Sequence, residues 1–236
     1  MPKIRAIVFD HYGTLADIRT NEEKGEIFRC LSLYLQYYGA HISERTLKSS
    51  LGLEKQRYLK AKKEDFPEID LEIIFKTILK KHQLHDPCLS ESCCKLFRLL
   101  SRERFQLFPD ALPVLKEMKS SGYPLALVSD AQKVFALEEV KMLGLDEFFP
   151  YVVLSTYLGF RKPDPRLFAI AYSLLQIPPA QSVYIGDNPA KDIAGAKKSG
   201  MQAILVRNSR HKNQETQADF YAEDLWEAWD WIQRHG

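Results

Sequence analysis

Short apolar runs recur along the chain, and β-branched and aromatic side chains are enriched in each. The runs are IRAIVF (4–9), PLALVS (124–129), YVVLS (151–155), SVYIG (182–186) and AILVRN (203–208). Such runs are typical of buried strands. Segments with helical spacing of apolar residues separate the later runs and end at Gly122, Gly144 and Gly200, and glycine commonly terminates helices. This alternation predicts parallel strands joined by helical crossovers, in a three-layer α/β domain.

The stretch between the first two predicted strands is too long for a single crossover. Residues 17–104 are charged, hold few strand-like runs and carry apolar residues at helical spacing, such as Ile27 and Leu31. We therefore expect an inserted helical domain of roughly four helices. Residues 1–16 and 105–236 would then form the α/β core.

Composition is that of an ordinary globular protein. The chain has 236 residues, of which 45% are hydrophobic and 27% are charged, unlike a disordered or fibrous protein. The formal net charge of +2 provides no strong field for nucleic acid or an anionic membrane. No signal peptide and no apolar stretch of about 18 residues is visible. We expect a cytoplasmic protein, a monomer or homodimer, that binds neither nucleic acid nor membrane.

Polar residues occur where the predicted strands end. Asp10 follows the first strand, Ser129 and Asp130 end the second, and Asp187 follows the fourth, while the loop GFRKPDP after the third supplies Lys162. The carboxyl ends of parallel strands form the ligand-binding edge of an open sheet. Each residue alone also fits a turn or a helix cap. Those local roles do not require a hydroxyl, a cation and several carboxylates at one edge, so we expect a functional site there.

Four motifs occur in the order DHYGTL, LVSD, RKPDP and GDNPAKD, with the helical insert after the first. In this order they resemble the haloacid dehalogenase superfamily of hydrolases with a helical C1-type cap. The resemblance spans residues 4–208. It implies a three-layer, Rossmann-like parallel sheet core with an inserted all-helical cap domain. The cap is matched only by its position and helical character, so nothing about the substrate follows from it.

The resemblance implies a role for each residue at the strand ends. Asp10 would be the nucleophile and form a covalent aspartyl intermediate that water then opens. Thr14 and Ser129, with the backbone N–H of Asp130, would bind the anionic group being transferred. Lys162 would neutralise charge on the nucleophile and the substrate.

The resemblance also implies a metal site. Asp187 would join Asp10 in binding Mg²⁺, with the backbone carbonyl of Tyr12 as a further ligand. Asp192 would orient Lys162 or a metal-bound water. The residues support this reading, because two neighbouring carboxylates at positions 10 and 187 are costly unless a cation lies between them.

Tyr12 departs from the phosphatase pattern. In the phosphatases that this chain resembles, an acid at this position protonates the leaving oxygen and later activates water, and such catalysis contributes about 10² to 10⁴ in rate. A phenol, with an ordinary pKa near ~10, is a poor base and only a fair acid. A leaving halide needs no proton, and FDHYGTL resembles the first motif of the family's dehalogenases. GDNPAKD instead keeps Asp187 and Asp192 at the spacing of a metal site.

Three hypotheses follow. The first is a Mg²⁺-dependent phosphomonoester hydrolase acting on a small phosphorylated metabolite, which the fourth motif favours. The second is a metal-independent 2-haloacid dehalogenase-like hydrolase, in which an arginine of the cap would hold the substrate carboxylate. The third is a weakly active or non-enzymatic binding protein, which Tyr12 favours and the retained Asp10, Lys162 and Asp187 disfavour. Candidates for the cap arginine are Arg19, Arg29, Arg45 and Arg57.

Overall fold

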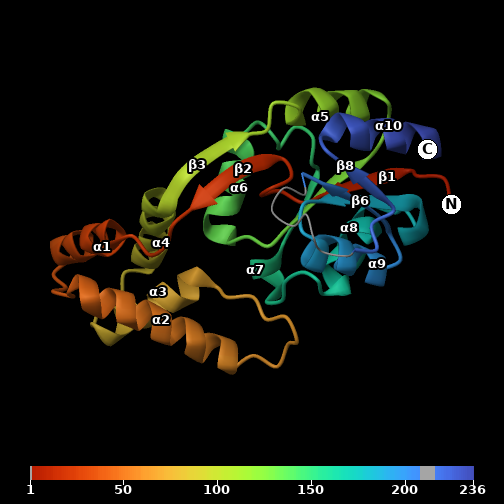
Figure 1. Cartoon of the computed structure of the whole chain (residues 1–236). Coiled ribbons are helices and arrows are strands. Elements are labelled where there is room, and N and C mark those ends of the chain that lie inside the picture. The colour runs from red at the N-terminus through yellow and green to blue at the C-terminus, as the bar shows by residue number, and fades with distance from the viewer. Residues whose placement is uncertain (1, 208–215) are drawn as a thin grey trace.

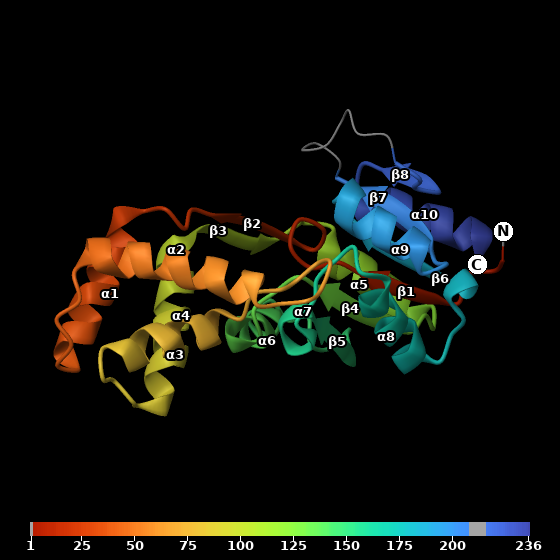
Figure 2. The same ribbon diagram turned by 90° about the horizontal axis from the view of Figure 1, so that it is seen from below.

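The computed structural model of this chain describes residues 2–207 and 216–236. A sheet-centred core and a group of helices lie side by side (Figure 1 and Figure 2). Asn208, the last residue of the strand predicted at 203–208, lies outside the described residues. The two ends of the chain lie on the side of the core that faces away from α1–α4 (Figure 1). There the backbone N–H of Ile4 donates to the carbonyl of His235 at 3.0 Å. Within the described residues, no helix combines the length and apolar character needed to cross a bilayer.

A six-stranded parallel sheet forms the centre of the core, in the order β5-β4-β1-β6-β7-β8. The strands are β1 (Ala6–Phe9), β4 (Leu125–Ser129), β5 (Tyr151–Leu154), β6 (Ser182–Gly186), β7 (Gln202–Val206) and β8 (Phe220–Ala222). The first five confirm the predicted apolar runs. The edge strand β8 has only three residues, which is too short to show a strand pattern in the sequence.

Helices cover both faces of the sheet and complete the three predicted layers. In β1, Ile7 and Phe9 face one hydrophobic cluster, whereas Ala6 and Val8 face the other, because successive side chains of a strand point to opposite faces. Figure 1 shows α5 and α10 on one side of the sheet and α8 and α9 on the other. The core helices are α5 (Ala111–Ser120), α6 (Lys133–Met142), α7 (Ser155–Leu158), α8 (Pro165–Leu175), α9 (Ala194–Lys198) and α10 (Leu225–His235), with short turns η1 (Pro179–Gln181) and η2 (Pro189–Ile193).

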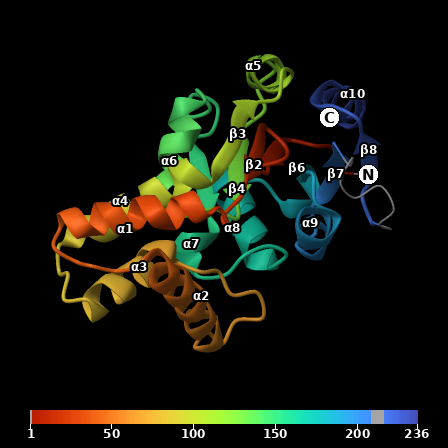
Figure 3. The same cartoon turned by 60° about the vertical axis from the view of Figure 1, so that its left-hand side comes forward.

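The segment between β1 and β4 contains the expected helices, α1 (Gly25–Tyr37), α2 (Glu44–Lys60), α3 (Leu71–Lys81) and α4 (Pro87–Ser101). Capping side chains begin three of them, since Ser43, Asp70 and Asp86 each accept a hydrogen bond from a backbone N–H of the first turn. The helices enclose a hydrophobic cluster of their own, against which Val134 and Phe135 of α6 also pack. The helical group therefore rests on α6 of the core, as Figure 3 shows.

The two connections between the helices and the core pair as an antiparallel sheet of β2 (Ala16–Thr20) and β3 (Arg102–Leu107). The sequence did not predict this sheet, because ADIRT and RERFQL are mostly polar and most of their side chains are partly or fully exposed. The expected boundary after residue 104 therefore falls inside a strand.

Candidate active site

The polar residues predicted at the strand ends converge on one pocket of about 250 Å³. Asp10 follows β1, Ser129 ends β4, and Asp187 follows β6, while Lys162 comes from the loop after α7. The same pocket is lined by Tyr12, Asp130, Asn188, Lys191 and Asp192. The pocket lies at the carboxyl edge of the sheet, where parallel strands place their ligand-binding groups.

Lys162 lies between two carboxylates. Its Nζ is 2.5 Å from Oδ1 of Asp10 and 2.6 Å from Oδ1 of Asp192, and it is also 3.2 Å from the hydroxyl of Tyr184. Burial alone would lower the pKa of Lys162, but the charges of Asp10 and Asp192 outweigh burial and hold this pKa well above its usual value. Lys162 is therefore a permanent cation in the pocket.

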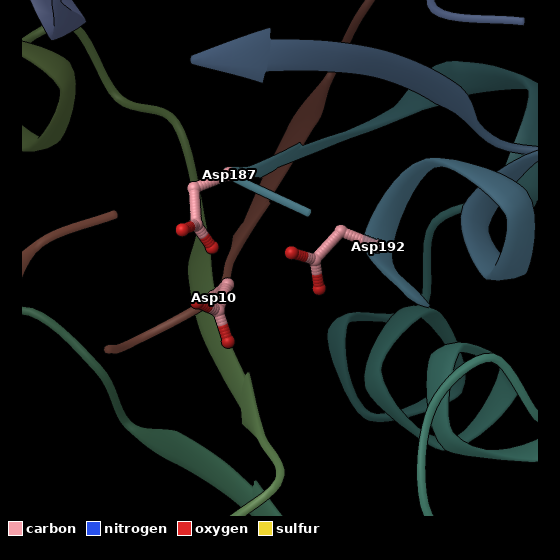
Figure 4. A group of neighbouring side chains, drawn as sticks. All are labelled: Asp10, Asp187 and Asp192. Atoms are coloured by element: carbon pink, nitrogen blue, oxygen red, sulfur yellow. The ribbon is translucent and has the colours of Figure 1, made fainter. Parts of the chain in front are cut away.

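A third carboxylate, Asp187, lies beside the two that contact Lys162. Oxygens of Asp10, Asp187 and Asp192 lie within 4.8 Å of one another, and Figure 4 shows the three groups directed toward a common space. Burial, together with the charges of Asp192 and Asp187, outweighs the opposing charge of Lys162 and raises the pKa of Asp10 to about 8. Lys162 therefore does not offset the burial and mutual repulsion of these carboxylates, and a further cation among them would favour their charged forms. Such a set of oxygen ligands fits a divalent cation such as Mg²⁺.

Two glycines leave the space that the side chains of Asp187 and Asp192 occupy. A Cβ on Gly13, whose φ is +98°, would lie 2.3 Å from Oδ2 of Asp187, and a Cβ on Gly186 would lie 2.5 Å from Cβ of Asp192. Either approach is closer than side-chain carbon atoms tolerate. Gly13 therefore lets the first motif approach the fourth, and Gly186 lets Asp192 pack against the start of its own motif.

Asp192 is held from both sides. Its Oδ2 accepts the backbone N–H of Asn188 at 2.9 Å, while its Oδ1 faces Lys162. The side chain of Asn188 in turn accepts hydrogen bonds from the backbone N–H groups of Ala190 and Lys191 at the start of η2. Asp192 therefore contacts Lys162, the residue that it was expected to orient, and that role stays a prediction.

The groups expected to bind an anion lie beside Asp10. Oγ1 of Thr14 is 3.3 Å from Oδ2 of Asp10. Oγ of Ser129 is buried, and it has no hydrogen-bond partner among the described residues. Asp130 accepts the backbone N–H of Lys162 at 2.9 Å and lies 3.4 Å from Nζ of Lys191. Its carboxylate thus braces the loop of Lys162, and its backbone N–H is the group left to bind an anion.

Tyr12 lines the pocket but directs its hydroxyl elsewhere. The phenol donates a hydrogen bond to Glu139 of α6. Burial raises the pKa of Tyr12 well above its usual value, and the charge of Glu139 raises it further. The phenol therefore keeps its proton and donates it in the hydrogen bond to Glu139.

A second pocket, of about 280 Å³, lies between the helical segment and the core and shares Tyr12 and Asp130 with the first. Its walls include Lys55 of α2 and Arg98 of α4. None of the four arginines proposed from the sequence lines either pocket, and all four are exposed: Arg19, Arg29, Arg45 and Arg57. Arg98 was not among the candidates, and its guanidinium is paired with Glu139.

Sequence reasoning missed three residues around the site. Tyr184 lies within the apolar run of β6, where an aromatic residue is typical of a buried strand, yet its hydroxyl contacts Lys162. Its position two residues before GDNPAKD was the available signal. Arg98 and Glu139 lie on helices of different parts of the chain, 41 residues apart, and no local pattern pairs them.

Comparison with known proteins adds independent information. The family model described as haloacid dehalogenase-like hydrolase matches residues 4–200. Glyceraldehyde 3-phosphate phosphatase of Methanopyrus kandleri is 34% identical over 112 residues, which is 48% of this chain and 48% of the relative. This chain thus spans about half the length of that relative.

Two dehalogenases are also similar. The (S)-2-haloacid dehalogenase 4A of Burkholderia cepacia is 27% identical over 208 residues, or 86% of this chain and 83% of that protein. The crystal structure of a 2-haloacid dehalogenase from Pseudomonas syringae pv. Tomato superposes with a TM-score of 0.76, 22% identity and full coverage of both chains. At that identity the superposition supports the fold alone.

Proposed function

Because this chain belongs to the haloacid dehalogenase-like hydrolases, we propose that it is a Mg²⁺-dependent phosphomonoester hydrolase acting on a small phosphorylated metabolite. The observation that carries the proposal is the group formed by Asp10, Asp187 and Asp192, whose oxygens lie within 4.8 Å of one another. One buried ammonium, that of Lys162, contacts Asp10 and Asp192 of this group. Burying these carboxylates in their charged forms is costly. A divalent cation at Asp10 and Asp187, with the backbone carbonyl of Tyr12, offsets that cost.

The residues of the pocket support nucleophilic catalysis. The Asp10 carboxylate attacks phosphorus, and a new P–O bond forms as the bond to the leaving oxygen breaks. Ser129, Thr14 and the backbone N–H of Asp130 bind the phosphoryl oxygens, and Lys162 neutralises charge on the nucleophile. Water then attacks the aspartyl phosphate, releasing phosphate and restoring Asp10. Bound Mg²⁺ supplies charge neutralisation for the phosphoryl group.

Residues 17–104 serve as the cap in this proposal, and residues 1–16 and 105–236 as the core. The second pocket, between them, receives the leaving group. Tyr12 contributes its backbone carbonyl to the metal, whereas its phenol, bonded to Glu139, is a poor proton donor. The enzyme should therefore be slow with alkyl leaving groups, which need a proton.

A dehalogenase-like activity is the second candidate. It is favoured by the match over 86% of this chain to a haloacid dehalogenase and by Tyr12. It is disfavoured because Arg98, the arginine of the helical segment in the second pocket, is already neutralised by Glu139. Arg98 therefore does not offer an unpaired guanidinium to a substrate carboxylate.

The test uses purified protein and its Asp10→Asn variant. An aryl phosphate with Mg²⁺ measures phosphatase activity, and 2-chloropropionate measures halide release. We expect phosphate release that EDTA abolishes and that Asp10→Asn lacks. Phosphate release that survives EDTA or the substitution would refute the proposal. Halide release in EDTA would establish the dehalogenase instead, and inactivity on both would favour a binding protein.

A further inference from the structure

A buried ion pair joins the helical segment to the core beside the active site. Arg98 of α4 donates from Nε and Nη2 to the two carboxylate oxygens of Glu139 of α6, each at 2.7 Å. The Arg98 side chain is 14% exposed and that of Glu139 4%. Two parallel N–H···O bonds of this kind are strong and geometrically specific. The pair therefore sets how α4 sits on α6.

The same carboxylate holds the loop of the nucleophile. Tyr12, two residues after Asp10, donates its hydroxyl to Glu139. The Arg98 guanidinium lies 5.2 Å from the centre of the Tyr12 ring. The His11 ring stacks on the Tyr12 ring, with the two ring centres 4.1 Å apart. Tyr12 is thus held by Glu139 of the core and by Arg98 of the helical segment together.

We propose that Glu139 and Arg98 are positioning residues for the hydrolysis reaction. They hold Tyr12, and through it the turn of residues 10–14, in the reactive arrangement when the helical segment is seated on α6. The inference deepens the proposed function, since it concerns the same site and reaction. It assigns the Tyr12 phenol to alignment of the turn rather than to proton transfer.

The turn is sensitive to such alignment. It contains the nucleophile Asp10, the glycine in close contact with Asp187, and Thr14 at 3.3 Å from Oδ2 of Asp10. Displacement by about 1 Å lowers a rate by about 10²-fold in well-aligned sites. A change at Glu139 or Arg98 is therefore expected to act on turnover although neither residue contacts the nucleophile.

A neighbouring ion pair provides a matched control. Lys95 of α4 and Glu138 of α6 meet at 2.6 Å on the same two helices, but their side chains are 37% and 60% exposed. Among the described residues, neither side chain of this pair has a hydrogen bond or ion pair with the turn of residues 10–14. Glu138→Gln and Lys95→Met therefore repeat the chemical changes of Glu139→Gln and Arg98→Met at a surface contact, where an ion pair contributes little.

The kinetic test compares an aryl and an alkyl phosphate, both with Mg²⁺. We expect Tyr12→Phe and Glu139→Gln each to lower kcat about 10-fold or more for both substrates, and the double variant to lose no more than the worse single one. Glu138→Gln should keep the wild-type kcat. Additive losses, or an unchanged kcat in Glu139→Gln, would overturn the proposal. So would a Tyr12→Phe loss confined to the alkyl phosphate, because that is the signature of a general acid.

Amide hydrogen exchange tests the proposal without any activity. In the metal-free protein, Arg98→Met should accelerate exchange of the amides of residues 10–14 at least several-fold, whereas Lys95→Met should not. Equal exchange in the two variants would overturn the positioning role. If the wild type hydrolyses no phosphate, the proposed function fails, and this exchange experiment alone decides whether Glu139 and Arg98 position the turn.

Discussion

The ammonium of Lys162 lies 2.5 Å from the carboxylate of Asp10, and both side chains are almost completely buried. A second carboxylate, Asp192, holds the same ammonium at 2.6 Å. Removing this cation would leave buried carboxylates without a partner, which is far more costly than losing a surface ion pair. The catalytic role proposed for Asp10 therefore depends on Lys162.

Lys162→Met should reduce kcat for an aryl phosphate by at least about 100-fold, because the positive charge beside the nucleophile and the phosphoryl group is lost. Steady-state kinetics with Mg²⁺ measure the effect, and circular dichroism checks the fold. Lys197→Met is the control, since Lys197 pairs with Asp219 at 2.7 Å outside the pocket. A loss below about 10-fold in Lys162→Met would contradict the role assigned to this cation.

Mg²⁺ should stabilise the protein, because ligand binding to the native state alone raises the free energy of unfolding. At a concentration 100 times the dissociation constant the gain is about 2.7 kcal/mol, or roughly 5 to 10 °C in Tm for a chain of this size. Thermal melts with Mg²⁺ and with EDTA measure it. Asp187→Asn should abolish most of the shift, and Asp146→Asn, at an exposed position, should retain it. A shift that survives in Asp187→Asn would place the ion elsewhere.

Gly13→Ala should weaken Mg²⁺ binding, because the added Cβ would meet Asp187 at 2.3 Å. Gly39→Ala is the control, since Gly39 also has a positive φ, +85°, but its Cβ would meet no atom within 4 Å. Both variants should lose roughly 1 to 2 kcal/mol of stability from the left-handed backbone. Only Gly13→Ala should lose the Mg²⁺-dependent rise in Tm. Equal Mg²⁺ responses would show that Asp187 is not constrained by this contact.

Tyr12→Asp should raise the ratio of the alkyl phosphate rate to the aryl phosphate rate. The new carboxyl group can protonate the oxygen of an alkyl leaving group, whereas an activated aryl leaving group departs without being protonated. The ratio is the proper measure, because loss of the bond to Glu139 lowers both rates together. A ratio unchanged from that of Tyr12→Phe would mean that proton donation does not limit the reaction with alkyl substrates.

Glu68 should make stability depend on pH. It is a buried carboxylate in the second pocket that accepts a hydrogen bond from Ser155 at 2.7 Å, and burial raises its pKa above 4.5 despite this bond. A raised folded-state pKa stabilises the protein below the unfolded pKa, and this contribution is lost as pH rises through the folded value. Relative to wild type, Glu68→Gln should therefore gain stability between about pH 4 and pH 8.

Urea denaturation at about pH 4 and at about pH 8 measures the difference in stability between Glu68→Gln and wild type. Glu64→Gln is the control, because Glu64 lies nearby on the same loop but is partly exposed and paired with Arg166. If the stability difference between Glu68→Gln and wild type stayed constant across this pH range, the carboxyl group would titrate alike in the folded and unfolded states.

Much of the fold was predictable because its signals are local. A strand buried on both faces needs a continuous apolar run, and each of the runs at β1, β4, β5, β6 and β7 has one. The strands β2 and β3 were not predicted because they are polar and are stabilised by pairing with each other over a long separation in sequence, as between Asp17 and Gln106. The side chains of Asp17 and Arg104, 87 residues apart, also meet at 2.9 Å.

The sequence by itself determined which groups meet at the carboxyl edge of the sheet. Asp10, Lys162 and Asp187 each follow directly from a strand or a short loop, so the topology of a parallel sheet suffices to bring them together. Only the tertiary structure decided what each group touches. The partner of Tyr12 is Glu139, 127 residues away, held in turn by Arg98 of the helical segment. Such a contact depends on how two packed helices approach each other, so it cannot be predicted from the spacing of residues along the chain.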